Sequence, residues 1–145
     1  MGIVVIVGES RADELLTSLA TVRASDRVSV NCGEAVVIMG KNACAEVISA
    51  LGVIVDGDEP CADIPRCVQL IACGVSPKNT VSVTSRTADK ITLSLNRSVH
   101  TADGICEPLE LPTDDDKSVS EYDLMAAFAA RILLKHNTEP TLPPQ

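Results

Sequence analysis

Four short runs of aliphatic residues organise the first half of this chain, and each run ends in a turn that contains glycine. Their lengths suit β-strands. The near absence of polar residues within them is typical of strands that are buried on both faces of a parallel sheet. The chain has one Phe, one Tyr and no Trp, so aliphatic side chains must form its core. The predicted strands are residues 2–8, 35–39, 53–56 and 68–72.

Apolar residues at helical spacing predict three helices that alternate with or follow these strands. The first covers residues 10–22, with Ser10 as its N-cap, and the second covers residues 43–51. A third begins with Ser118 and Glu121, which have the spacing of a capping box. Alternating strands and helices are typical of an α/β domain.

Polar and apolar residues alternate after the fourth strand, which predicts an antiparallel hairpin over residues 81–84 and 91–95 and a third strand over 105–111. We therefore predict a three-layer α/β fold with a mainly parallel sheet and an antiparallel hairpin extension. One domain is expected over residues 1–136, followed by a flexible, Pro-rich tail over 137–145.

The net charge of −8 argues against nucleic acid and against anionic membrane surfaces as partners, because both need clustered Lys and Arg. The apolar start, residues 2–7, is too short to span a membrane and has no basic segment before it. We expect a cytoplasmic protein. The sequence identifies neither a small-molecule nor a protein partner, and it leaves open whether the chain forms a homo-oligomer.

The carboxyl ends of the predicted strands are the expected binding site, since an open sheet leaves a crevice there. Acidic residues in these turns favour a cation or a hydroxyl-rich ligand over a phosphate. For the aspartates, a purely local role in the turn is favoured over a ligand role, because Asp stabilises turns by bonding to its own backbone. The candidate ligand-binding residues are Gly8, Ser10, Lys41, Asp56, Asp58 and Gly74.

Six cysteines occur without a Cys-x-x-Cys pair, so reduced, structural thiols are the main expectation. Cys44 would lie on the apolar side of the second helix, where we predict a buried and inert thiol. Cys61, Cys67 and Cys73 are spaced evenly by six residues and are the weak candidates for a metal or redox site.

Two short motifs resemble the central domain of the Mur ligases, the enzymes that build peptidoglycan precursors. The turn Asp56-Gly-Asp-Glu-Pro60 resembles their Asn-Ala-Asp-Asp-Pro turn, and Cys73-Gly-Val75 is similar to their Thr-Tyr/Phe-Gly-Leu element. A hairpin and an Ala-rich helix follow in the same order, so the resemblance covers residues 53–135. It implies an α/β domain linked to cell-wall precursor metabolism.

The chain departs from the Mur ligases at the residues that perform their chemistry. It has no glycine-rich ATP loop ending in Gly-Lys-Thr, and Asp56 stands where the family has the Asn near the adenine. No carbamylated Lys or Mg-binding pattern can be placed either. Phosphoryl transfer needs such groups to stabilise its charge. We therefore expect no catalytic residue, no cofactor and no tight Mg-ATP binding.

Three hypotheses follow from the sequence. The first is a non-catalytic, Mur-ligase-like binding or interaction module. The second is a small-molecule or nucleotide-binding enzyme that uses the crevice at the strand ends. The third is a cysteine-based metal or redox site.

Overall fold

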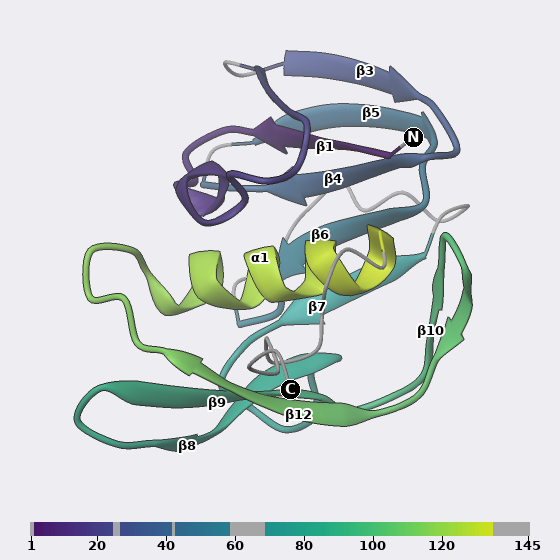
Figure 1. Ribbon diagram of the computed structural model, residues 1–145. Coiled ribbons are helices and arrows are strands. Elements are labelled where there is room, and N and C mark those ends of the chain that lie inside the picture. Colours follow the sequence, from purple (N-terminus) through teal and green to yellow (C-terminus); the bar gives the residue numbers. More distant parts are fainter. Residues whose placement is uncertain (1, 25–26, 42, 59–68, 135–145) are drawn as a thin grey trace.

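The computed structural model describes residues 2–24, 27–41, 43–58 and 69–134. This part of the chain is mostly β, with 50% strand and 15% helix, and it contains a β-solenoid of about three coils. The predicted three-layer α/β fold is therefore wrong, and so is the α/β domain that the resemblance to the Mur ligases implies. Figure 1 shows one long helix in front of a large sheet.

Six neighbouring strands of the eight-stranded large sheet are parallel to one another. They include all four of the aliphatic runs, so the prediction that these runs share one sheet is confirmed. Along the chain, each new strand of this sheet pairs with the strand before it. The one exception arises because the second strand lies on the outer side of the first, so that the third strand also pairs with the first. In spatial order they are β2 (Thr21–Ala24), β1 (Ile3–Val7), β4 (Ala35–Met39), β6 (Gly52–Asp56), β7 (Leu70–Cys73) and β8 (Val81–Arg86).

The rest of the sheet is antiparallel. The predicted hairpin is confirmed: β8 pairs with β9 (Lys90–Leu95), and β9 pairs with β12 (Leu109–Asp114) at the edge. The predicted third strand over residues 105–111 is divided in the structure. Its first residues belong to β11 (Gly104–Cys106), which forms a small hairpin with β10 (Val99–Thr101), and its last residues belong to β12.

A second, two-stranded sheet makes the chain a solenoid. It contains β3 (Arg27–Asn31) and β5 (Cys44–Ser49), which are parallel. The chain passes from β3 to β4 and from β5 to β6 through short turns, so two successive coils each contribute one strand to each sheet. This sheet occupies a position that the α/β prediction gave to helices.

The predicted helix over residues 43–51 is strand β5. Its buried residue, Val47, is four positions from Ala43, and a spacing of four fits both a helix and one face of a strand. Alternation decides the outcome, because Glu46 and Ile48 on either side of Val47 are exposed. Val47 and Ile48 are β-branched, which favours the strand, and β3 supplies the backbone hydrogen bonds.

The predicted helix over residues 10–22 is also wrong. Only Ala12–Leu15 is helical, as the 3-10 helix η1, and the chain then extends into β2. Ala12 and Leu16 are buried as a helix would bury them, but Val22 is 48% exposed. As a strand, this segment satisfies its backbone groups by pairing with β1.

Each buried strand contributes to two cores because alternate side chains point to opposite faces. In β4, Val36 and Ile38 face helix α1 (Glu121–Leu134), whereas Val37 and Met39 pack with the β3–β5 sheet. Helix α1 lies across the large sheet (Figure 1) and is the predicted C-terminal helix, now confirmed. The continuous apolar sequence of β4 follows from this coverage on both faces.

Some sequence predictions fall on residues outside the described ranges. These are the tail at 137–145 and the cysteines at 61 and 67. Within the described ranges, the structure contains no helix with both the length and the apolar character that crossing a membrane requires.

Candidate functional site

The turns that follow β1 and β4 are joined by the backbone. Glu9 N donates to Lys41 O at 2.8 Å, and Lys41 N donates to Glu9 O at 3.0 Å. This small antiparallel bridge closes the carboxyl ends of the two neighbouring strands. The predicted convergence of strand ends is therefore present at this edge of the sheet.

A cavity of about 270 Å³ opens beside this bridge. Glu9, Lys41 and Asp56 line it from the ends of β1, β4 and β6, so three of the four predicted turns contribute to it. The opposite wall comes from the start of α1, where Ser120, Tyr122 and Asp123 lie. We call this cavity the strand-end crevice. Binding of a ligand there stays a prediction.

Gly8 shapes the crevice without lining it. Its φ of 75° lies in the left-handed region, where L side chains are strained. A Cβ atom at this position would lie 2.6 Å from the Lys41 carbonyl oxygen. Glycine is therefore needed for the close approach of the two turns.

Ser10 is a structural residue of the site. It is only 5% exposed, and its hydroxyl donates to Asp123 Oδ1 at 2.6 Å. The same hydroxyl accepts the amide hydrogen of Ala12 at 3.2 Å, and Asp123 Oδ2 accepts that of Arg11 at 3.2 Å. Both carboxylate oxygens of the buried Asp123 are thus satisfied, and they connect the turn after β1 to α1.

Asp58 and Gly74 lie beside the crevice and hold two loops together. Asp58 Oδ2 accepts the amide hydrogen of Val75 at 2.9 Å, and its Oδ1 accepts from Asn79 Nδ2 at 3.3 Å. A Cβ atom on Gly74 would lie 2.5 Å from Asp58 Oδ1, so the glycine admits the carboxylate. The local, structural role considered for Asp58 is the one that its contacts support.

The tyrosine of α1 anchors the helix to the strand ends. Tyr122 Oη donates to the Met39 carbonyl at 2.6 Å and lies 3.2 Å from the Ile54 carbonyl. A phenolic hydroxyl has a single hydrogen, so the shorter bond takes the larger share of it. Tyr122 is the only tyrosine in a chain without tryptophan, so the ultraviolet signal reports on this site.

The wall from α1 was missed by the sequence reasoning. The predicted capping pair, Ser118 and Glu121, is wrong: the amide of Asp123 donates instead to Ser120 Oγ at 3.1 Å. Ser120 and Asp123 have the same three-residue spacing as a capping box, and this signal could have identified them. That this end of α1 lies over the crevice depends on packing across the whole fold.

The described cysteines contradict one of the cysteine predictions. Cys44 is exposed, so the expectation of a buried thiol is wrong. Cys73 is fully buried, and burial raises its pKa, with a smaller effect from the charge of Asp56. A thiol with a raised pKa is a poor metal ligand and nucleophile. Among the described residues, no group of three or more His, Cys, Asp or Glu side chains could hold a metal ion.

Comparison with known proteins adds no relative: no family model matches the chain, and neither the curated proteins nor the solved structures give a significant match.

Proposed function

We propose that this chain is a non-catalytic binding module of the cytoplasm, and that the strand-end crevice takes a small, neutral, hydroxyl-rich ligand such as a sugar or polyol. The observation that carries the proposal is the mixture of groups in one cavity. Glu9 and Asp56 offer carboxylate acceptors, while Lys41 offers an ammonium donor and Ser120 a hydroxyl. Neighbouring hydroxyl groups, which both donate and accept, suit such a mixture.

The size of the cavity supports a small ligand. Its volume of about 270 Å³ lies just under the range of about 300–1,000 Å³ that is common for ligand pockets. A metal ion is the weaker candidate, because the described residues here offer no group of three ligating side chains. A phosphate is weaker too, since Glu9 and Asp56 would repel it.

A binding role also fits the way the polar groups are used. The hydroxyl of Ser10 is engaged with Asp123 and Ala12, so it is not held as a nucleophile. Asp56 Oδ1 accepts the amide hydrogen of Asp58 at 2.9 Å, which fixes the direction of this carboxylate and leaves Oδ2 for a ligand. The cytoplasmic assignment is supported by the free thiols of Cys32 and Cys44 on the surface.

Titration of the chain with monosaccharides and cyclic polyols tests the proposal, with calorimetry and Tyr122 fluorescence as readouts. We expect one saturable site for a neutral polyol. Asp56→Ala should weaken it roughly tenfold, equal to about 1.4 kcal/mol, while the far-ultraviolet circular dichroism stays unchanged. Asp103→Ala is the matched control, because Asp103 is exposed in the β10–β11 turn.

Two results would count against this function. Micromolar binding of Mg-ATP would favour the nucleotide-binding enzyme instead. Absence of saturable binding across the polyol panel, or equal affinities of the wild-type and Asp56→Ala proteins, would remove the proposed ligand class.

A further inference from the structure

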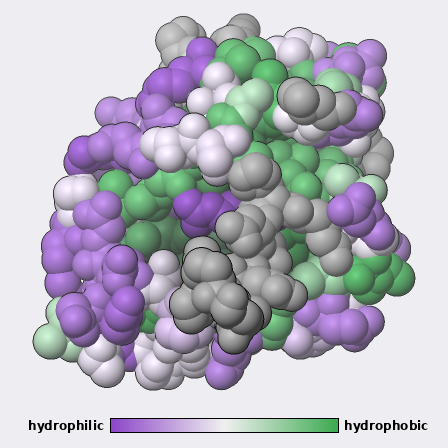
Figure 2. All heavy atoms as spheres, viewed as in Figure 1, coloured by the Kyte–Doolittle hydropathy of each residue, from purple (hydrophilic) through white to green (hydrophobic). Residues whose placement is uncertain are grey.

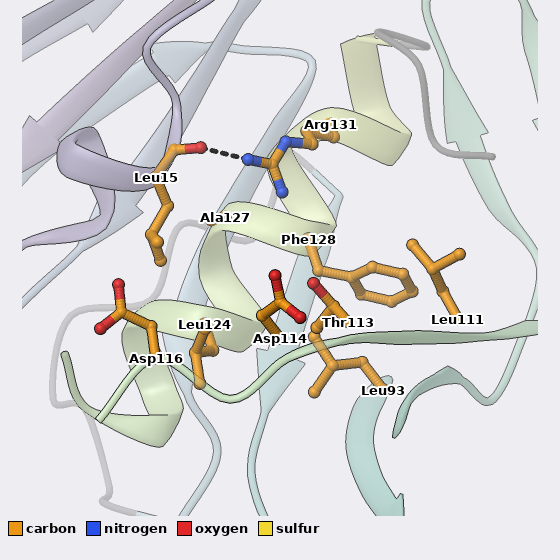
Figure 3. A pocket seen from close by; sticks show the side chains of 10 residues that line it. All are labelled: Leu15, Leu93, Leu111, Thr113, Asp114, Asp116, Leu124, Ala127, Phe128 and Arg131. Carbon is orange, nitrogen blue, oxygen red and sulfur yellow. Dashed lines mark hydrogen bonds between the residues drawn. The ribbon is translucent and has the colours of Figure 1, made fainter. Parts of the chain in front are cut away.

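A second cavity, also of about 270 Å³, lies between α1 and the large sheet and shares no lining residue with the strand-end crevice. It is bounded by η1, α1 and the strands β9 and β12 (Figure 3). Figure 2 shows hydrophobic side chains gathered on this face beside a hydrophilic patch at its centre. The apolar part of the wall consists mainly of Leu15, Leu93, Leu111, Leu124 and Phe128.

One cationic group enters this apolar wall. Arg131, from the last turn of α1, lines the cavity, and its guanidinium donates to the Leu15 carbonyl (Figure 3). Its partial burial lowers the pKa of Arg131, which shows that the charge is partly removed from water. Within the described ranges, no carboxylate lies at ion-pairing distance from this guanidinium.

The guanidinium of Arg131 has hydrogen-bond donors that no described residue uses. It carries five N–H donors in a planar fork, and the bond to Leu15 is the one interaction that it makes with the described residues. A fork of this kind matches the two oxygens of a carboxylate. A partly desolvated arginine without an anion is the feature of this cavity that the fold itself does not explain.

The two aspartates at the rim are already engaged. Asp114 Oδ1 accepts from Lys90 Nζ at 2.6 Å. Asp116 Oδ1 accepts from the amide and the hydroxyl of Ser118 at 2.9 and 2.5 Å. Asp116 keeps its negative charge, because Ser118 is neutral, but neither aspartate forms an ion pair with Arg131. The guanidinium of Arg131 is therefore the cationic donor of this cavity that an anionic ligand can contact.

We propose that this cavity binds an aliphatic monocarboxylate, with the carboxylate on the Arg131 guanidinium and the hydrocarbon chain against the leucines and Phe128. The volume restricts the ligand to a short or medium chain. The apolar contacts supply affinity, and the charge-assisted pair selects an anionic head group. This site is independent of the strand-end crevice, since none of the lining residues is shared.

The test is a calorimetric titration of the full chain with three probes of equal chain length: octanoate, octanol and octylammonium. We expect saturable binding of octanoate, binding of octanol at least tenfold weaker, and no saturable binding of octylammonium. Equal binding of octylammonium and octanoate, or no saturable binding of octanoate, would overturn the proposal without any variant being needed.

Two variants locate the site. Arg131→Met keeps an unbranched apolar stem and should weaken octanoate at least tenfold while octanol affinity stays the same. Arg97→Met is the matched control, because Arg97 also donates to a backbone carbonyl, that of Lys78 at 2.7 Å, and is exposed elsewhere. Unchanged octanoate affinity in a folded Arg131→Met protein would overturn the assignment. If that variant does not fold, Arg131→Lys replaces it, because lysine keeps the charge but lacks the planar fork of donors. The affinity for octanoate should again fall, and an unchanged affinity would again overturn the assignment.

Discussion

Ser10 donates a 2.6 Å hydrogen bond to Asp123, a residue 113 positions further along the chain. Both residues are buried, at 5% and 6% exposed. The bond connects the turn after the first strand to the first turn of the only long helix in the described part of the chain. It thereby sets the position of the helical wall of the strand-end crevice.

Substitution of Ser10 by Ala should destabilise the protein, because a buried carboxylate oxygen then loses its donor. Loss of a partner from a buried polar group costs about 1–3 kcal/mol, and more when that group is charged. Urea denaturation followed by circular dichroism measures the change. Ser29→Ala, at an exposed position of β3, is the control and should stay within about 0.5 kcal/mol of wild type. A Ser10→Ala protein as stable as that control would contradict the structural role.

Gly8 and Gly33 offer a matched pair of glycine substitutions. Gly8→Ala places a Cβ atom 2.6 Å from the Lys41 carbonyl at a φ of 75°, so both sterics and backbone strain oppose it. The strain alone is about 1–2 kcal/mol. At Gly33 no atom lies within 4 Å of the added Cβ, so Gly33→Ala should be neutral or stabilise by up to about 1 kcal/mol. Comparable stability of the two variants in urea would contradict this conformation of the β1 turn.

The strands were predictable from the sequence because a strand that is buried on both faces is apolar at consecutive positions. β4 and β6 are apolar at nearly every position, and each run is too short for an ordinary helix. The segment before β6 was not predictable from the same evidence. The spacing from Ala43 to Val47 suits a helix and a strand equally, and the choice depends on pairing with β3, which is distant in sequence.

The site divides in the same way. Glu9, Lys41 and Asp56 could be placed together because parallel strands end at a common edge. Tyr122 and Asp123 could not, since their position depends on how α1 packs over that edge. The sequence favoured a structural role for Asp58 in its own turn, but it did not indicate the bond to Asn79, which follows the next strand.

Acid should weaken the protein partly through Asp115. Hydrogen bonding to Lys117, and secondarily the charge of Arg86, hold the pKa of Asp115 below its usual value of 3.8 despite opposing desolvation. The folded state therefore binds fewer protons than the unfolded state near that pH. The resulting stability is present above about pH 4 and is lost as pH falls through the lowered pKa.

Asp115→Asn removes this titration. Its free energy of unfolding should therefore depend less steeply on pH than that of wild type below about pH 4. Urea denaturation over a series of acidic buffers measures the slope. Asp103→Asn, at an exposed turn, serves as the control and should keep the wild-type slope. Parallel slopes for Asp115→Asn and wild type would show that these ion pairs do not contribute.

Thiol reactivity should separate Cys73 from Cys32 and Cys44. The two exposed thiols should be alkylated readily by iodoacetamide at about pH 8. Cys73 should stay unmodified under the same conditions, because burial both blocks access and raises its pKa, so little thiolate forms. Peptide mass mapping after short exposures gives the rate at each site, and repetition in urea should bring Cys73 to the rate of the other two. Rapid labelling of Cys73 in the native protein would instead mean that the end of β7 opens readily. Because Cys73 pairs with Asp56, the strands behind Asp56 would then not be rigid enough to hold the strand-end crevice in one shape.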